Sequence, residues 1–512
     1  MMIRNIRIFI VLSILAVFGA SCNDFLDQPI LGKQVLENYF ANEDECLKAL
    51  SGCYASLSPE DWWENDLFYL VGDICSDDAF KGNSLEGDQR DFGELARFNI
   101  TPQNEWIQYK WQYAYEQVYR CNLVIKNVPD APVSDTFKAQ VLAEAKFLRA
   151  FAYFELVKNF GDVPLLLEPL TVNDPKQERV AAALIWGQIE KDLKEAADVL
   201  PERSEQTASA IGRATKGAAL AYLAKAYVYQ EKWSDAEPLA KQIIDTGEYN
   251  LNDPFTNVWS IHNPNGNGSI FEIQTVFDNV LDAGTVLPVF TRSRADGGWG
   301  FATPSSHLDN FMAGDPRRNA TIIKHGDYVD EDYPSYDTQL SENETGRINR
   351  KYWIAWNDRP AQSEHTRTPL NHILFRYADL LLLHAEAAWH NDHEGEAIAS
   401  VNKVRQRVGL SGISSTGEQL LLDIYHERRM ELALEGHRYY DLKRQKGLKY
   451  PNSPRLREVM EEFVDYNLGA NSDYDAGNAK GQLFDEDVHV LFPIPQAEID
   501  LSEGTLKQNS GY

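Results

Sequence analysis

Cysteine is scarce in this chain of 512 residues, and basic side chains and long apolar runs are scarce as well. Five cysteines cannot build a disulfide scaffold, and without a Cys-x-x-Cys pair a zinc ribbon has no support. Cys75 and Cys121 could pair in an oxidising compartment, but we expect two small buried thiols. After residue 21 no apolar stretch is long enough to cross a bilayer.

The charge balance narrows the choice of partners. The chain has 77 acidic and 49 basic residues, a formal net charge of -28. Phosphate backbones repel such a surface, so we expect no nucleic-acid partner, and we favour neutral ligands over strongly anionic ones. Hydrophobic residues at 43% and charged residues at 25% are ordinary for a globular protein, whereas 24 Tyr and 11 Trp are a surplus of aromatic rings.

The first 21 residues have the layout of a bacterial secretory signal. Arg4 and Arg7 precede an apolar run at 8–18, and the small residues 19–21 lead directly into Cys22. This run is too short to span a bilayer. A cysteine at this place indicates a lipoprotein signal, with Cys22 as the lipid-modified first residue; a plain signal peptide is the alternative.

The N-terminal half of the remaining chain reads mainly as helix. Ser134 can cap a long helix that ends near Gly161, and Pro164 prevents the helix from resuming. Its apolar residues recur every three or four positions, at Phe137, Val141, Ala145, Leu148, Ala152 and Leu156.

An internal repeat predicts stacked helical pairs. Small residues lie 12 apart at Ala224 and Ala236, and again at Ala385 and Ala397, as in tetratricopeptide (TPR) repeats. Neither copy is ideal, because His384 replaces the expected Leu. Such pairs must stack to bury their apolar faces, so at least three pairs are implied.

Residues 250–365 are rich in Pro, Gly, Asn and Asp and predict a loop-rich insertion. Short alternating stretches at Ile270–Val276 and Lys351–Trp356 favour a few strands or hairpins. Many aromatic residues argue against disorder here: Trp299, Phe301, Tyr328, Tyr333, Tyr336, Trp353 and Trp356.

Six strings follow one another along the chain: CNDFLD at 22–27, AEAKFLRA at 143–150 with NFGDVP at 159–164, RYADLLL at 376–382, ERRMEL at 427–432, EGHR at 435–438 with DLKR at 441–444, and PIP at 493–495. In this order they resemble the SusD/RagB family of outer-membrane lipoproteins of Bacteroidetes, and the match runs nearly from end to end.

The resemblance implies a mainly α fold, a TPR-like superhelix of helical pairs with a loop-rich face that carries a few short β-hairpins. We expect a signal peptide at 1–21 and a single SusD-like body at 22–512. Within it, a helical part at 22–250 and a loop-rich insertion at 251–365 precede a C-terminal helical part at 366–512.

The resemblance also implies a function without catalysis. Such a lipoprotein is exposed on the cell surface at the outer membrane, captures a glycan and delivers it to a SusC-like TonB-dependent barrel. Capture of peptides, as in RagB-like proteins, is the first alternative. A glycoside hydrolase is the weaker one, since paired carboxylates occur in any chain with 77 acids.

Several signature residues are expected to hold the fold together. Arg149 and Arg428 lie among apolar positions near acids such as Glu144 and Glu431, and buried arginines need paired acceptors. Gly436 is placed where a helix must allow close approach.

The candidate ligand-binding residues combine aromatic rings with polar neighbours, because sugars present flat apolar faces ringed by hydroxyls. Rings on helices, such as those of Trp111, Trp186 and Trp233, are assigned to the core instead. The candidates are Trp62, Trp63, Asp77, Asp78, Trp299 and Tyr336.

No metal or cofactor is expected to take part. His426-Glu427 lacks the second histidine of an HExxH motif. His384, His390 and His393 would converge only if the intervening helix broke. Whether a structural calcium ion binds is left open by the sequence. Asp473, Asp475 and Gly477 resemble part of a calcium loop, but its later ligands are missing.

Overall fold

The computed structural model describes residues 39–58, 67–83, 87–278, 283–340, 345–361, 366–468 and 480–512. The longer helices are α2 (Glu43–Ala55), α6 (Glu105–Asn127), α7 (Asp135–Phe160), α8 (Ala182–Ala197), α9 (Lys216–Tyr229), α10 (Trp233–Thr246), α14 (Tyr377–His390), α15 (Glu394–Arg407), α16 (Gly417–Leu432) and α18 (Arg455–Leu468). Shorter ones are α4 (Val71–Ile74), α5 (Arg90–Ala96), α11 (Leu287–Thr291), α12 (Ser306–Phe311), α13 (Arg318–Thr321), α17 (Arg438–Arg444), α19 (Lys480–Leu483) and α20 (Gln496–Leu501).

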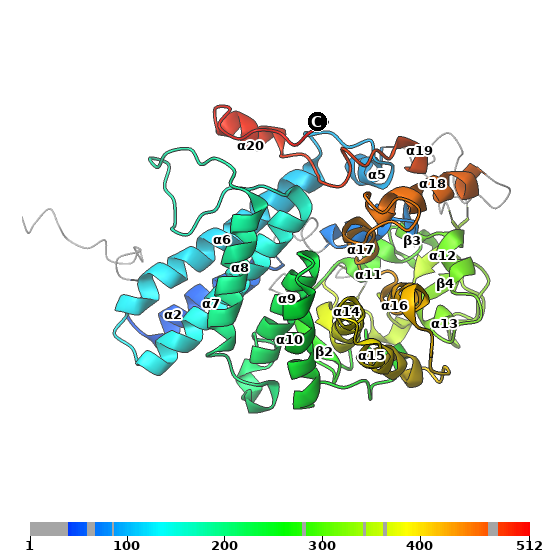
Figure 1. Cartoon of the computed structure of the whole chain (residues 1–512), viewed down its shortest axis with the longest axis horizontal. Coiled ribbons are helices and arrows are strands. Elements are labelled where there is room, and N and C mark those ends of the chain that lie inside the picture. Colours follow the sequence, from blue (N-terminus) through cyan, green and yellow to red (C-terminus); the bar gives the residue numbers. More distant parts are fainter. Residues whose placement is uncertain are drawn as a thin grey trace, which may run out of the picture.

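Helix α7 forms as its apolar spacing predicts. Ser134 is its N-cap, and the Ser134 hydroxyl accepts a hydrogen bond of 3.3 Å from the backbone N–H of Phe137. Gly161 ends the helix with a φ of +72°, a conformation that costs glycine little. The helix packs between α6 and α8 (Figure 1), so its apolar residues are buried on more than one side.

The predicted helical pairs are confirmed. Helix α9 pairs with α10, and α14 pairs with α15, at the two places where the small residues recur. The two pairs lie against each other, and the rings of Trp233 and His390 stack there with centroids 4.0 Å apart. His384 takes the place of the repeat's apolar residue because its ring nitrogen bonds the Ser400 hydroxyl at 2.8 Å inside the pair.

Three small antiparallel sheets join segments that are far apart in sequence. The strands are β1 (Ala79–Gly82) with β3 (Phe301–Pro304), β2 (Ser269–Ile273) with β6 (His372–Arg376), and β4 (Ile322–Lys324) with β5 (Arg347–Asn349). The prediction of a strand at Ile270–Val276 is confirmed over its first four residues. The strand predicted at Lys351–Trp356 is wrong, because the chain turns there and enters a short 3-10 helix, η8 (Trp356–Asp358).

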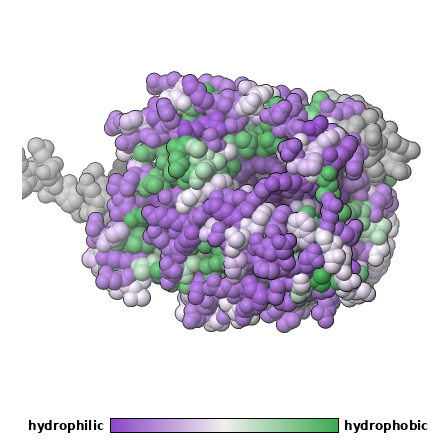
Figure 2. Space-filling view, in the orientation of Figure 1, coloured by the Kyte–Doolittle hydropathy of each residue, from purple (hydrophilic) through white to green (hydrophobic). Residues whose placement is uncertain are grey.

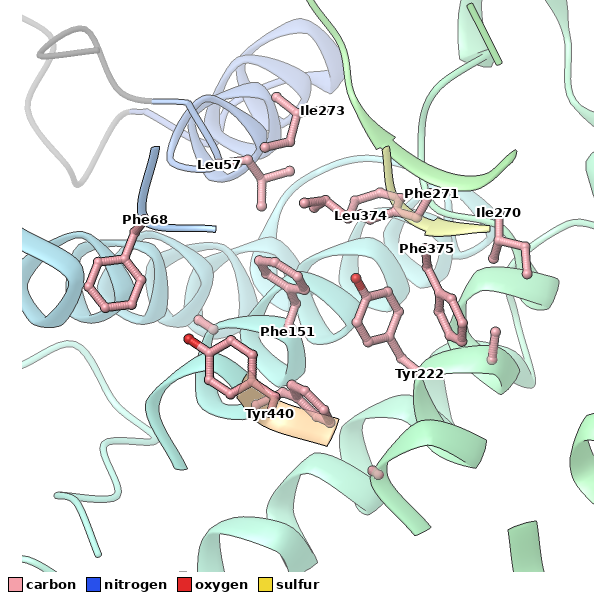
Figure 3. Packing of buried hydrophobic residues seen from close by; sticks show 14 of the residues in the cluster. Leu57, Phe68, Phe151, Tyr222, Ile270, Phe271, Ile273, Leu374, Phe375 and Tyr440 are labelled. Carbon is pink, nitrogen blue, oxygen red and sulfur yellow. The ribbon is translucent and has the colours of Figure 1, made fainter. Parts of the chain in front are cut away.

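The sheet of β2 and β6 forms part of the main core. Figure 3 shows Phe271 and Phe375 from these strands beside Phe151 of α7 and Tyr222 of α9. The Tyr222 ring lies 5.3 Å from Phe375 and 5.5 Å from Phe151, both edge to face. Each such ring contributes roughly 1.5–3 kcal/mol by leaving water. The core therefore ties the loop-rich segment to the helical pairs, and the boundaries expected at 250 and 365 stay predictions.

The two signature arginines are buried in ion pairs, but not with the acids that were expected. Arg149 makes two hydrogen bonds of 2.8 Å to Asp192. Arg428 bonds Asp379 at 2.5 Å and Asp441 at 2.7 Å. The helical pairs bring these acids in from other elements, which neighbours in sequence cannot reveal.

Gly436 lies in the turn before α17 rather than inside a helix. Its φ is +78°, and a Cβ there would lie 2.4 Å from the carbonyl oxygen of Tyr69. The expected close approach is confirmed, and any side chain would collide with backbone.

The surface is largely hydrophilic on the face shown in Figure 2, with hydrophobic residues gathered in a few patches. Across the described ranges, every helix is too short or too polar to cross a lipid bilayer. Cys22 lies outside the described residues, so its lipidation stays a prediction.

Candidate binding cleft on the loop-rich face

The segment 256–261 and the chain that follows β5, at 350–358, line a cleft of about 210 Å³. We call it the aromatic cleft, because two indoles line it beside aliphatic and charged side chains. Among its lining residues are Trp259, Ile261, Arg350, Trp353, Ile354 and Asp358.

The indoles of the cleft are held by neighbouring charges. The Lys351 ammonium lies 4.4 Å from the Trp259 ring and 2.6 Å from the Glu435 carboxylate. Burial lowers the pKa of Lys351 to about 8 although Glu435 opposes this shift. Trp353 donates its indole N–H to Asp296 over 3.2 Å. These contacts fix the rings before any ligand arrives.

Trp356 projects from the rim of the cleft. Its side chain is 57% exposed, whereas its neighbours Ala355 and Asp358 line the cleft. The guanidinium carbon of Arg359 lies 5.5 Å from the Trp356 ring centroid and supports the ring. An exposed indole beside a polar hollow has the combination that sugars require, a flat apolar surface near hydrogen-bonding groups.

Asp296 organises this part of the molecule. Its carboxylate accepts hydrogen bonds from the Tyr336 hydroxyl at 2.9 Å, from the indole of Trp353, from the Tyr333 hydroxyl, and from Arg359 at 2.6 and 3.0 Å. Asp296 is only 8% exposed. One carboxylate therefore joins three loops.

The two tyrosines are donors in this cluster. Burial, followed by Asp296, raises the pKa of Tyr333 to about 12 and raises that of Tyr336 further. Both hydroxyls keep their protons at neutral pH. With Ile323, Val329, Ile348 and the Trp353 ring they form a small second core under the cleft.

Trp299 is partly exposed in a tight turn. The backbone N–H of Trp299 donates to Val289 over 2.7 Å, and its ring meets Phe290 edge to face at 6.2 Å. Gly298 lies so close to the Arg292 carbonyl oxygen that a Cβ would approach it to 2.2 Å. The turn therefore presents Trp299 in a fixed orientation.

Asp77 and Asp78 are buried rather than displayed. Arg438 bonds Asp77 at 2.8 Å, and Arg429 bonds Asp78 at 2.8 Å. Burial alone would raise the pKa of Asp77, but Arg429 and Arg438 hold it below its usual range. The two carboxylates tie the β1 segment to α16 and α17, and a ligand contact at either one stays a prediction.

The remaining predicted site residues are either buried or outside the described part of the chain. Tyr336 is 1% exposed and lies under the cleft as a bond donor to Asp296. Trp62 and Trp63 lie outside the described residues, and so do Asp473, Asp475 and Gly477. The signal that singles out Trp299, an aromatic ring in a loop near polar residues, also fits Trp353 and Trp356, for which the sequence predicts only ordered structure.

The residues considered for metal or disulfide chemistry have separate partners. His393 contacts Glu237 at 2.7 Å, away from the partners of His384 and His390. In the part of the chain that is described, no three His, Cys, Asp or Glu side chains gather as a metal site. Cys75 and Cys121 are buried free thiols, as expected.

Two open grooves of about 380 Å³ each lie on the helical parts. One is lined by Trp111, Tyr115 and Leu506, but Trp111 is only 3% exposed. The other lies between α8, α9 and α10. Neither groove displays an exposed indole.

Models of two known protein families match different parts of this chain. The model of the SusD family matches residues 267–512, and a family described as starch-binding associating with outer membrane matches residues 61–228. SusD-like protein P2 of Formosa agariphila is 26% identical over 99% of this chain and all of its own.

Solved structures of other proteins have the same fold over most of this chain. A laminarin-binding SusD-like protein is 27% identical, with a TM-score of 0.75, over 92% of this chain and all of its own. Surface glycan-binding protein A from Bacteroides fluxus gives the same values. The chain therefore belongs to the SusD/RagB family, whose members are binding proteins and not enzymes.

Proposed function

We propose that this protein captures a glycan at the aromatic cleft of its loop-rich face, without cleaving it. The observation that carries the proposal is the exposed indole of Trp356 at the rim of a hollow lined by two further indoles and by charged groups. Related structures support it. Surface glycan-binding protein A from Bacteroides thetaiotaomicron, 25% identical with a TM-score of 0.73, is known in complex with laminarihexaose.

The same proposal includes a place and a partner. Cys22 would carry the lipid that holds the protein at the outer membrane, exposed on the cell surface. The bound glycan would pass to a SusC-like TonB-dependent barrel. The matching family described as associating with the outer membrane supports the location.

Stacking can be tested on Trp356. Trp356→Ala should weaken retention by the cognate polysaccharide in affinity electrophoresis by about 1–3 kcal/mol, the range known for base–aromatic stacking and used here as an analogy. Trp299→Ala tests the neighbouring turn in the same way. Tyr119→Ala is the matched control, because Tyr119 is an exposed ring, 44% accessible, on helix α6.

Unchanged retention of both tryptophan variants would remove the loop-rich face from the proposal. Release of reducing sugar that stops when a single carboxylate is substituted would contradict binding without catalysis. For the anchor, Cys22→Ala should abolish labelling by a palmitate analogue in growing cells. Labelling that persists in this variant would contradict lipidation at Cys22.

A further inference from the structure

Arg350 differs from the arginines around it. Arg318 and Arg347 are paired with Asp309 at 2.7 and 2.9 Å, and Arg359 is paired with Asp296. The Arg350 guanidinium has one backbone acceptor, the carbonyl oxygen of Asn319 at 3.0 Å. No carboxylate among the described residues forms an ion pair with it.

The surroundings of Arg350 leave its charge incompletely compensated. Burial lowers the pKa of Arg350 from its usual value, and attraction by Asp330 and Asp327 offsets only part of this shift. The group stays charged at neutral pH, because arginine is not deprotonated in proteins. Arg350 therefore brings into the cleft a cation without an ion-pair partner among the described residues.

The other charged groups of the cleft have partners. Lys351 is paired with Glu435, and Asp358 lies 3.1 Å from the ring nitrogen of His262, which neutralises the carboxylate only when the imidazole is protonated. Asp358 keeps acceptor capacity for hydroxyl groups, since a carboxylate has about four lone-pair sites. Arg350 offers a planar set of donors, a shape that matches a carboxylate in bidentate contact.

We propose that the aromatic cleft takes an acidic sugar, with Arg350 as the contact for its anionic group. This inference rests on the proposed function and names the ligand class of the same site. The sugar ring would lie against the indoles, its carboxylate on Arg350 and its hydroxyls toward Asp358. The volume of about 210 Å³ suits one such residue of a longer chain.

An acidic sugar is the opposite of the neutral ligand that the net charge alone favours. Exposed charges farther apart than about 8 Å largely screen each other out at physiological ionic strength, so a direct contact in the cleft outweighs the distant acidic surface. The Arg350 guanidinium then decides which sugar is bound. A sulfate ester carries a negative charge as a carboxylate does, so the test includes a probe of each kind.

The test is affinity electrophoresis of the purified protein at 0.15 M salt. Gels contain polygalacturonate, alginate or glucuronoxylan as uronic probes, a carrageenan as the sulfated probe, and laminarin or xylan as neutral probes. Methyl-esterified polygalacturonate is the matched uncharged form of the first probe. We expect at least one uronic polymer to be retained about tenfold more tightly than its esterified or carboxyl-reduced form, the effect of one charge-assisted contact.

Arg350→Gln should remove this preference, and Arg350→Lys should restore part of it. Lys324→Gln removes the same charge from the exposed side chain at the end of strand β4 and should change nothing. Retention by carrageenan alone, also lost in Arg350→Gln, would assign a sulfate ester as the anion.

Three results would overturn the inference. They are equal retention of charged and uncharged forms, a preference that survives Arg350→Gln, and retention by neutral polymers only. The last result would leave the proposed function intact, because Trp356→Ala should still weaken binding. Retention by no probe of any class would count against both proposals.

Discussion

Replacing Asp296 by Asn should loosen the loops under the aromatic cleft. The substitution keeps the size of the side chain but removes its charge and turns one acceptor oxygen into a donor. The Arg359 side chain, 8% exposed, then loses its ion-pair partner among the described residues, and an N–H or O–H donor of the cluster loses its acceptor. Breaking a buried ion pair costs about 3–5 kcal/mol.

The loss should be local. The second core beneath Asp296 consists of Ile323, Val329, Tyr336 and Ile348 and is separate from the main core. Lowering the free energy of opening this core by about 3 kcal/mol raises the population of the open form on the order of a hundredfold. Hydrogen exchange should therefore accelerate in peptides from 327–338 and 353–359, while α7 exchanges as before.

Asp332→Asn is the control, because this exposed residue lies in the 327–338 segment whose exchange is followed and undergoes the same loss of charge. Its exchange pattern should match that of the unsubstituted protein. Asp296→Asn should also weaken glycan retention, since the same carboxylate fixes Trp353 and, through Arg359, Trp356. An exchange pattern equal to that of Asp332→Asn would refute the role given to Asp296.

Three further predictions concern the stability of the fold. Arg428→Met should lower the free energy of unfolding in urea by about 3–5 kcal/mol, because Asp379 keeps its burial and loses a partner; a loss below 1 kcal/mol would contradict this. Burial lowers the pKa of His372 to about 4, below the 6.5 of an unfolded chain, so the unfolded state binds the proton first. His372 alone should lower stability by about 1.4 kcal/mol per pH unit between pH 6.5 and 4, and His372→Phe should flatten the slope by that amount in urea titrations. Gly436→Ala should lower the melting temperature by several degrees, since its Cβ would collide with the Tyr69 carbonyl; a cost of about 1 kcal/mol corresponds to 2–4 °C in large domains.

Local patterns in the sequence predict the helical part of the fold well. The spacing of apolar residues and the Ser134 cap place α7, and small residues 12 apart place two helical pairs. Both signals act between residues at most 12 positions apart, where sequence distance and spatial distance agree. The two-stranded sheets could be predicted only as short strands, because their partners lie up to about 220 residues away.

The candidate site was predicted less completely for the same reason. Asp77 looks like a free polar group in sequence, yet Arg438, 361 positions later, bonds it in the fold. Asp296 and Arg359 carry no local motif, and 63 residues separate them. The tryptophans of the insertion were visible, but only the fold distinguishes the exposed ring of Trp356 from buried ones.

The most direct test of capture at this face is a crystal structure of the protein with an oligosaccharide cut from a polysaccharide that it retains. We expect electron density for an uncleaved sugar in the aromatic cleft, with one ring stacked on Trp356. Density confined to the groove beside Trp111, or to any other part of the helical surface, would contradict the account.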